Sequence, residues 1–201
     1  RRVDKTALVG AVLRGDPRLL VSRRVLPAAD LFLAVIIDCS GSMEGDNLER
    51  ARLFAALIAE AARGLRGVDA RFFGFTDETI FDAGDARRCA VSGLVSDGGN
   101  NDAAALFHVA QVARRSRRRT RLLVMISDGS PTECSVTALS NLVVRLTRQG
   151  FLCAQVAVEE IEDICFPHHV LLDGDDMNGA VKAFAVVVER LVLLGTGRPV
   201  G

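Results

Sequence analysis

Short apolar runs alternate along this chain with longer segments in which apolar residues recur every three or four positions. The runs LFLAVII (31–37) and RLLVMIS (121–127) predict strands that are buried on both faces of a sheet. Further strands are expected at 68–75, 79–81, 151–158 and 167–172, and helices at 46–65, 103–113, 135–148 and 177–194. Asp46 or Asn47 is expected to cap the first of these helices. This alternation predicts a doubly wound α/β fold, with a mainly parallel central sheet and helices on both faces.

The chain has the length of one α/β domain. It contains 201 residues, of which 49% are hydrophobic, and this composition excludes a disordered chain. We expect the domain to span residues 30–195, with a lead-in from a longer protein at 1–29 and a tail at 196–201. Within the lead-in, the patterns favour a short helix at 6–13 and an extended segment at 19–26.

Net charge and cysteine content limit the classes of partner and the cellular location expected for the domain. Lys+Arg and Asp+Glu each number 25, so the net charge is zero, and we expect neither nucleic acid nor a membrane as partner. No apolar run is long enough to span a bilayer. The five cysteines are scattered without paired spacing, which favours free buried thiols and a cytoplasmic, reducing location. Cys39 is expected to point into the packing between sheet and helices.

Oxygen-bearing side chains follow both of the most apolar strands. Asp38, Ser40 and Ser42 come directly after the first, and Asp128 comes directly after the other. Ligands of open α/β sheets bind at the carboxyl ends of the strands, and carboxylates and hydroxyls suit a hard cation such as Mg²⁺ or Mn²⁺. The alternative to a metal site is a purely structural Ser/Gly turn after the strand, with Asp38 as its cap. A third oxygen-rich loop, 98–102, precedes the helix at 103–113.

The spacing Asp-x-Ser-x-Ser, here DCSGSM at 38–43, resembles the metal-ion-dependent adhesion site of von Willebrand factor A (vWA) domains. The loops NNDAAAL at 100–106 and ISDGSP at 126–131, with GFT at 74–76, are most similar to cobaltochelatase subunits and nitric-oxide-reductase activation proteins. The resemblance covers residues 31–194 and implies strand order 3-2-1-4-5-6. It also implies a site for Mg²⁺, with Mn²⁺ or Ca²⁺ as alternatives, whose ligands would be Asp38, Ser40, Ser42, Asp102 and Asp128. Asn100 and Asn101 are alternatives to Asp102, because adhesion vWA domains usually have Thr there.

This family resemblance implies recognition and not catalysis. The metal would keep a position open for an Asp or Glu of a partner protein, and the resemblance implies an AAA+ ATPase in a bacterial chelatase-like complex as that partner. Two other functions stay open: a Mg²⁺-dependent phosphohydrolase that uses Asp38, and a scaffold whose metal site is vestigial. Two charged segments have no assigned role. The arginine run at 114–121 fits a solvated turn or a contact with an acidic partner or nucleic acid, and the loop at 159–163 is acidic.

Overall fold

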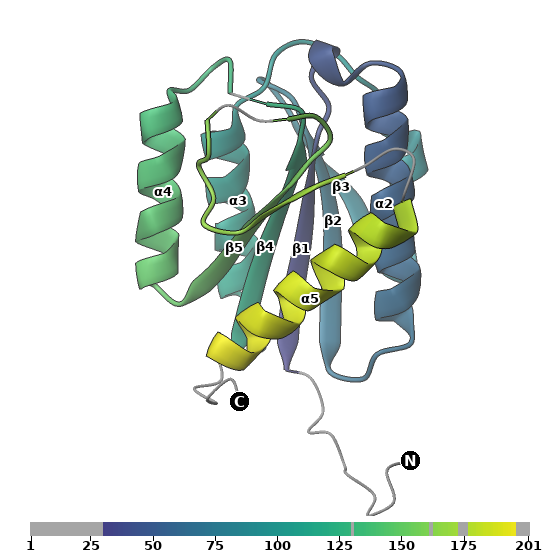
Figure 1. Ribbon diagram of the computed structural model, residues 1–201, viewed down its shortest axis with the longest axis vertical. Helices are drawn as coiled ribbons and strands as arrows, with labels where there is room; N and C mark the ends of the chain where they lie inside the picture. The colour runs from purple at the N-terminus through teal and green to yellow at the C-terminus, as the bar shows by residue number, and fades with distance from the viewer. Residues whose placement is uncertain (1–29, 130, 161–162, 173–176, 196–201) are drawn as a thin grey trace, which may run out of the picture.

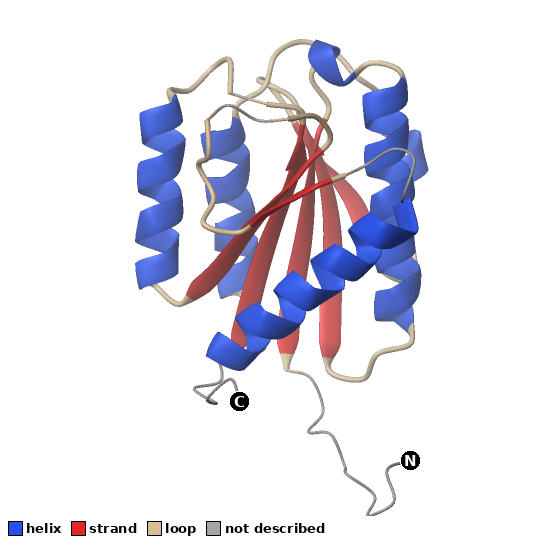
Figure 2. Cartoon of the chain, in the orientation of Figure 1, coloured by secondary structure: helices blue, strands red, loops and turns tan. Residues whose placement is uncertain are grey.

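The computed structural model describes residues 30–129, 131–160, 163–172 and 177–195. Its centre is a six-stranded sheet with the order β3-β2-β1-β4-β5-β6 (Figures 1 and 2). All neighbouring strands are parallel except β3, which runs antiparallel to β2 at the edge. The predicted fold class and strand order are therefore confirmed.

The strands and helices fall close to their predicted positions. The strands are β1 (Leu31–Asp38), β2 (Val68–Phe75), β3 (Ile80–Asp85), β4 (Thr120–Ser127), β5 (Phe151–Ala157) and β6 (His169–Leu171). The helices are α2 (Asp46–Arg63), α3 (Asp102–Arg114), α4 (Val136–Arg148) and α5 (Met177–Gly195), with single 3₁₀ turns η1 (Gly41–Met43) and η2 (Val91–Gly93). The predicted lead-in, including 6–13 and 19–26, and the tail lie outside the described residues.

Each face of the sheet has its own apolar core. Every residue of β1 is buried, because its alternate side chains enter opposite cores. Leu33, Val35 and Ile37 pack with α2 and α5, whereas Ala34 and Ile36 pack with α3 and α4. The parallel strands run between these helix pairs toward one edge, which is uppermost in Figure 1.

Two predicted details at the ends of elements are wrong. Asp46 or Asn47 was expected to cap α2, but the N-cap residue is Gly45, with φ of 84° and no side-chain hydrogen bond to the helix. A glycine fits because this backbone conformation is costly for other residues. The last strand was expected over 167–172, but β6 pairs with β5 only over His169–Leu171.

Candidate metal centre

Three loops meet at the carboxyl edge of the sheet. β1 and β4 are neighbours, so the loops that follow Asp38 and Ser127 lie side by side. The loop before α3 joins them, since the Gly41 N–H donates to the carbonyl of Gly98 at 2.9 Å. The three oxygen-rich loops noted in the sequence therefore lie together at this edge.

Asp38 is the buried centre of the first loop. Its Oδ1 accepts a hydrogen bond from the backbone N–H of Ser40 at 2.8 Å, and its Oδ2 accepts one from Nδ2 of Asn100 at 2.8 Å. Burial raises the pKa of the Asp38 carboxyl, these hydrogen bonds lower it, and the nearby charge of Asp128 raises it further. Ser40 is buried, whereas Ser42 is exposed, and their hydroxyl oxygens lie 3.1 Å apart.

Asn100 connects all three loops. Its Oδ1 accepts hydrogen bonds from the N–H of Thr132 at 2.6 Å and from the Thr132 hydroxyl at 2.8 Å. Because a backbone N–H can only donate, this contact fixes the orientation of the amide and turns Nδ2 toward Asp38. The carbonyl of Asn100 also accepts from the N–H of Glu133 at 3.0 Å. One buried side chain thus holds the first loop to the third.

Asp102 is the unusual group of the site. It is the first residue of α3, its exposed fraction is only 1%, and neither carboxylate oxygen has a hydrogen-bond partner. Burial, followed by the charges of Asp38 and Asp128, raises its pKa to about 7. Burying an ionised carboxylate without hydrogen bonds costs free energy, so binding of a proton or a cation to Asp102 would stabilise the folded protein.

The neighbouring asparagines are already engaged. The Oδ1 of Asn101 caps α3 by accepting from the N–H of Ala104 at 3.0 Å, and the Oδ1 of Asn100 is occupied by Thr132. Of the three second-loop candidates, only Asp102 therefore has side-chain oxygens that accept no hydrogen bond. Asp128, at the end of β4, is partly exposed and near enough for its charge to affect both buried aspartates.

The donor set fits a hard cation only if hydroxyls and water take part. Within the ranges that the structure describes, no three His, Cys, Asp or Glu side chains form a ready-made metal site. The serine hydroxyls would therefore have to supplement the carboxylates, as Mg²⁺ coordination by oxygen and water permits. Such a donor set would explain why the two buried oxygens of Asp102 have no hydrogen-bond partner within the protein.

Sequence reasoning missed the connecting role of Asn100 and did not single out Thr132. The only sequence signal was the position of Thr132 just after the Asp128 loop. Cys39, in contrast, was expected to point into the packing between sheet and helix, and it does so: it lies in the core beside α2, where burial raises the pKa of its thiol to about 11.

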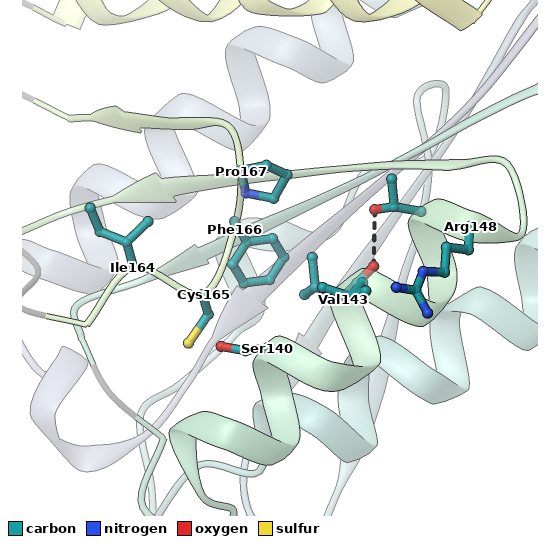
Figure 3. A pocket seen from close by; sticks show the side chains of 9 residues that line it. Ser140, Val143, Arg148, Ile164, Cys165, Phe166 and Pro167 are labelled. Atoms are coloured by element: carbon teal, nitrogen blue, oxygen red, sulfur yellow. Dashed lines mark hydrogen bonds between the residues drawn. The ribbon is translucent and has the colours of Figure 1, made fainter.

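A separate apolar groove lies away from these loops. It has a volume of about 550 Å³ and runs between α4 and residues 164–167 (Figure 3). Val143 and Phe166 contribute to its lining, and Arg148 lies at one side. None of the described residues that line it carries a carboxylate, so its chemistry differs from that of the site at the sheet edge.

A family model for the von Willebrand factor type A domain matches residues 33–164. The chain belongs to this family. It is a family of protein-interaction modules. The match covers all but the first two residues of β1, the whole of β4 and the three loops described above. No curated protein matches the sequence.

Solved structures share the fold of this vWA domain at low sequence identity. The vWF domain of the type V pili tip protein Mfa5 from Porphyromonas gingivalis is 10% identical, with a TM-score of 0.67 over 88% of this chain and 98% of that one. The SpRpn10 VWA domain is 14% identical, with a TM-score of 0.59 over 75% and 93%. A von Willebrand factor type A protein from Catenulispora acidiphila is 14% identical, with a TM-score of 0.58 over 84% of this chain but 42% of its own.

The described helices are each too short or too polar to cross a bilayer.

Proposed function

We propose that this vWA domain is a metal-dependent protein-interaction module. Mg²⁺ would be held at the carboxyl edge of the sheet by Asp38, Ser40, Ser42, Asp102 and Asp128, with Mn²⁺ or Ca²⁺ as substitutes. An Asp or Glu of a partner protein would occupy a remaining coordination position. The observation that carries this proposal is Asp102, whose two buried oxygens have no hydrogen-bond partner and whose pKa is raised by burial and by the charges of Asp38 and Asp128.

Electrostatics gives the physical reason. In the absence of a cation, Asp102 is buried near Asp38 and Asp128, and the cost appears as its raised pKa. A divalent cation would relieve both the repulsion and the missing hydrogen bonds of Asp102. The hydrogen bonds from Ser40 and Asn100 leave each oxygen of Asp38 with a second lone pair for an ion or its water shell.

Recognition fits these residues better than hydrolysis does. Asp38 has an exposed fraction of 0%, and both of its oxygens already accept hydrogen bonds, so it is a poor nucleophile. No Lys, Arg or His lies in the described parts of the loops 39–45, 96–101 and 128–135 to act as a general acid or to bind a phosphate. The similarity of the loop motifs to chelatase-type proteins extends the proposal to a cytoplasmic AAA+ ATPase as partner.

Calorimetric titration of Mg²⁺ and Mn²⁺ into chelator-treated protein tests the site. We expect saturable binding by the wild type, and its loss in the Asp38→Ala/Asp128→Ala variant. Asp69→Asn, which removes an exposed charge at the opposite end of β2, serves as control and should bind as the wild type does. The metal site would be refuted if the wild type bound no Mg²⁺, or if it bound Mg²⁺ as weakly as the double variant does. Mg²⁺-dependent phosphatase activity that Asp38→Asn abolishes would favour the hydrolase instead.

A further inference from the structure

Five exposed acidic residues lie on or beside the loops of the candidate metal site, four of them bonded to those loops and one to the start of α2. Backbone N–H groups of the four donate to carbonyls of the site: Glu44 to Gly41, Asp77 to Gly99, Asp97 to Cys39, and Glu133 to Asn100. Glu159 accepts from Nδ2 of Asn47, at the start of α2, at 2.7 Å. We call Glu44, Asp77, Asp97, Glu133 and Glu159 the acidic rim.

The rim has no cationic counterpart in these loops. In the described parts of segments 39–49, 76–79, 95–101, 128–133 and 158–160, the sequence contains no Lys, Arg or His. The nearby guanidinium of Arg52 is directed to the carbonyl of Leu94. The negative charge of the rim is therefore presented to whatever approaches the metal.

The opposite edge of the sheet carries a cluster of arginines. Exposed arginines gather where α3 and α4 end and β4 begins: Arg114, Arg115, Arg117, Arg119, Arg145 and Arg148. Gln149 joins the two helix ends by accepting from Arg114 at 2.5 Å. Within the described residues, this arginine cluster and the acidic rim thus lie at opposite ends of the sheet, and each end has its own preference for partners.

We infer that the protein surface that docks on the metal face is basic, with Arg or Lys side chains around the carboxylate that reaches the metal. The inference rests on the proposed function and specifies its partner. Three site aspartates already exceed the charge of a divalent cation, and the rim adds more negative charge around them. An acidic surface would therefore be repelled, whereas cationic side chains around one carboxylate would pair with the rim while that carboxylate binds the metal.

This chain itself presents a surface of that chemistry. Asp30, just before β1, lies 3.8 Å from the guanidinium of Arg118 and 3.7 Å from that of Arg119, at the basic edge. A second copy could thus offer one carboxylate surrounded by arginines to the acidic rim of the first. Such contacts between unlike faces form open chains of copies or closed rings.

Two labelled peptides test the inference by fluorescence anisotropy with Mg²⁺ at about 0.15 M salt. Both contain one central Asp, flanked by Arg in the first and by Glu in the second. We expect the Arg peptide to bind more tightly, and the rim variant Asp97→Asn/Glu133→Gln to weaken it by about tenfold, the combined effect of two surface charges. The control Glu60→Gln/Asp69→Asn removes as much charge from the opposite end and should change little.

The outcomes separate this inference from the metal proposal. Equal or tighter binding of the Glu peptide, or an equal loss in the control, would overturn the basic partner. Absence of Mg²⁺ binding by the wild type in the calorimetric titration would refute the metal site instead. The same holds for an Arg peptide whose binding changes neither with Mg²⁺ nor when its Asp is replaced by Asn. Salt-sensitive self-association in sedimentation, weakened by Arg117→Glu/Arg119→Glu, would support the inference with a second copy as partner.

Discussion

Replacing Asp102 by Asn should stabilise the metal-free protein at neutral and alkaline pH. The rise in the Asp102 pKa from 3.8 to about 7 corresponds to about 4 kcal/mol of destabilisation once the carboxyl is ionised. The asparagine amide removes the charge but remains buried without partners, which costs about 1–3 kcal/mol. We therefore expect the free energy of unfolding to increase by about 1–3 kcal/mol above pH 7 in the variant.

The pH dependence gives this prediction its sign. Since the folded state holds the Asp102 proton more tightly than the unfolded state does, the protonated carboxyl contributes its full stability below pH 3.8. That contribution is lost as the pH rises through about 7. The advantage of the variant should accordingly grow between these values and then level off. Chemical denaturation in the presence of a chelator, repeated across this range, measures it.

Magnesium should reverse the order of stability. A ligand that binds only the folded state adds about 2.7 kcal/mol at a concentration one hundred times its Kd. The wild type should gain this stability, and the variant, which lacks the Asp102 carboxylate, should gain much less. An Asp102→Asn variant that is less stable than the wild type without metal at pH 8, by an amount that does not change with pH, would refute the reasoning.

Three further substitutions or reagents test other parts of the structure. Thr132→Val removes the hydroxyl that binds Asn100 and should weaken Mg²⁺ binding about tenfold by calorimetry, whereas Thr132→Ser keeps the hydroxyl and should retain the affinity. Gly74→Ala would place a Cβ 2.5 Å from Leu94 Cδ2 and should cost about 1–3 kcal/mol in chemical denaturation. The Cys39 thiol, with its pKa raised to about 11 and no exposure, should resist alkylation at pH 8, and rapid labelling of this residue in the folded protein would contradict its burial.

The fold could be predicted because its signals are local. An apolar run such as that of residues 31–37 has no stable place except a strand covered on both faces, and the buried β1 confirms this. The ends of helices and strands were less predictable where they depend on backbone conformation and not on the type of side chain. The N-cap of α2 is a glycine with positive φ, although the neighbouring Asp46 has the side chain of a typical cap.

The candidate site was only partly visible in the sequence. Asp38 and Asp128 follow apolar strands, and the strand order implied by the vWA resemblance made these strands neighbours, which predicted that the two residues would meet. The role of Asn100 depends on Thr132, which is 32 positions away, and no local pattern reports a hydrogen bond of that kind. The choice among Asn100, Asn101 and Asp102 likewise required knowledge of which oxygen atoms were already engaged.

The fixed amide of Asn100 has a consequence for motion in this region. The Asn100 side chain binds Asp38 and Thr132, and the Asn100 backbone carbonyl binds the N–H of Glu133. The first and third loops therefore cannot separate without breaking several hydrogen bonds together. We expect the two loops to open as a single cooperative unit. The backbone amides of Ser40, Thr132 and Glu133 should then exchange with deuterium at one common rate, although they belong to segments about ninety positions apart in the sequence.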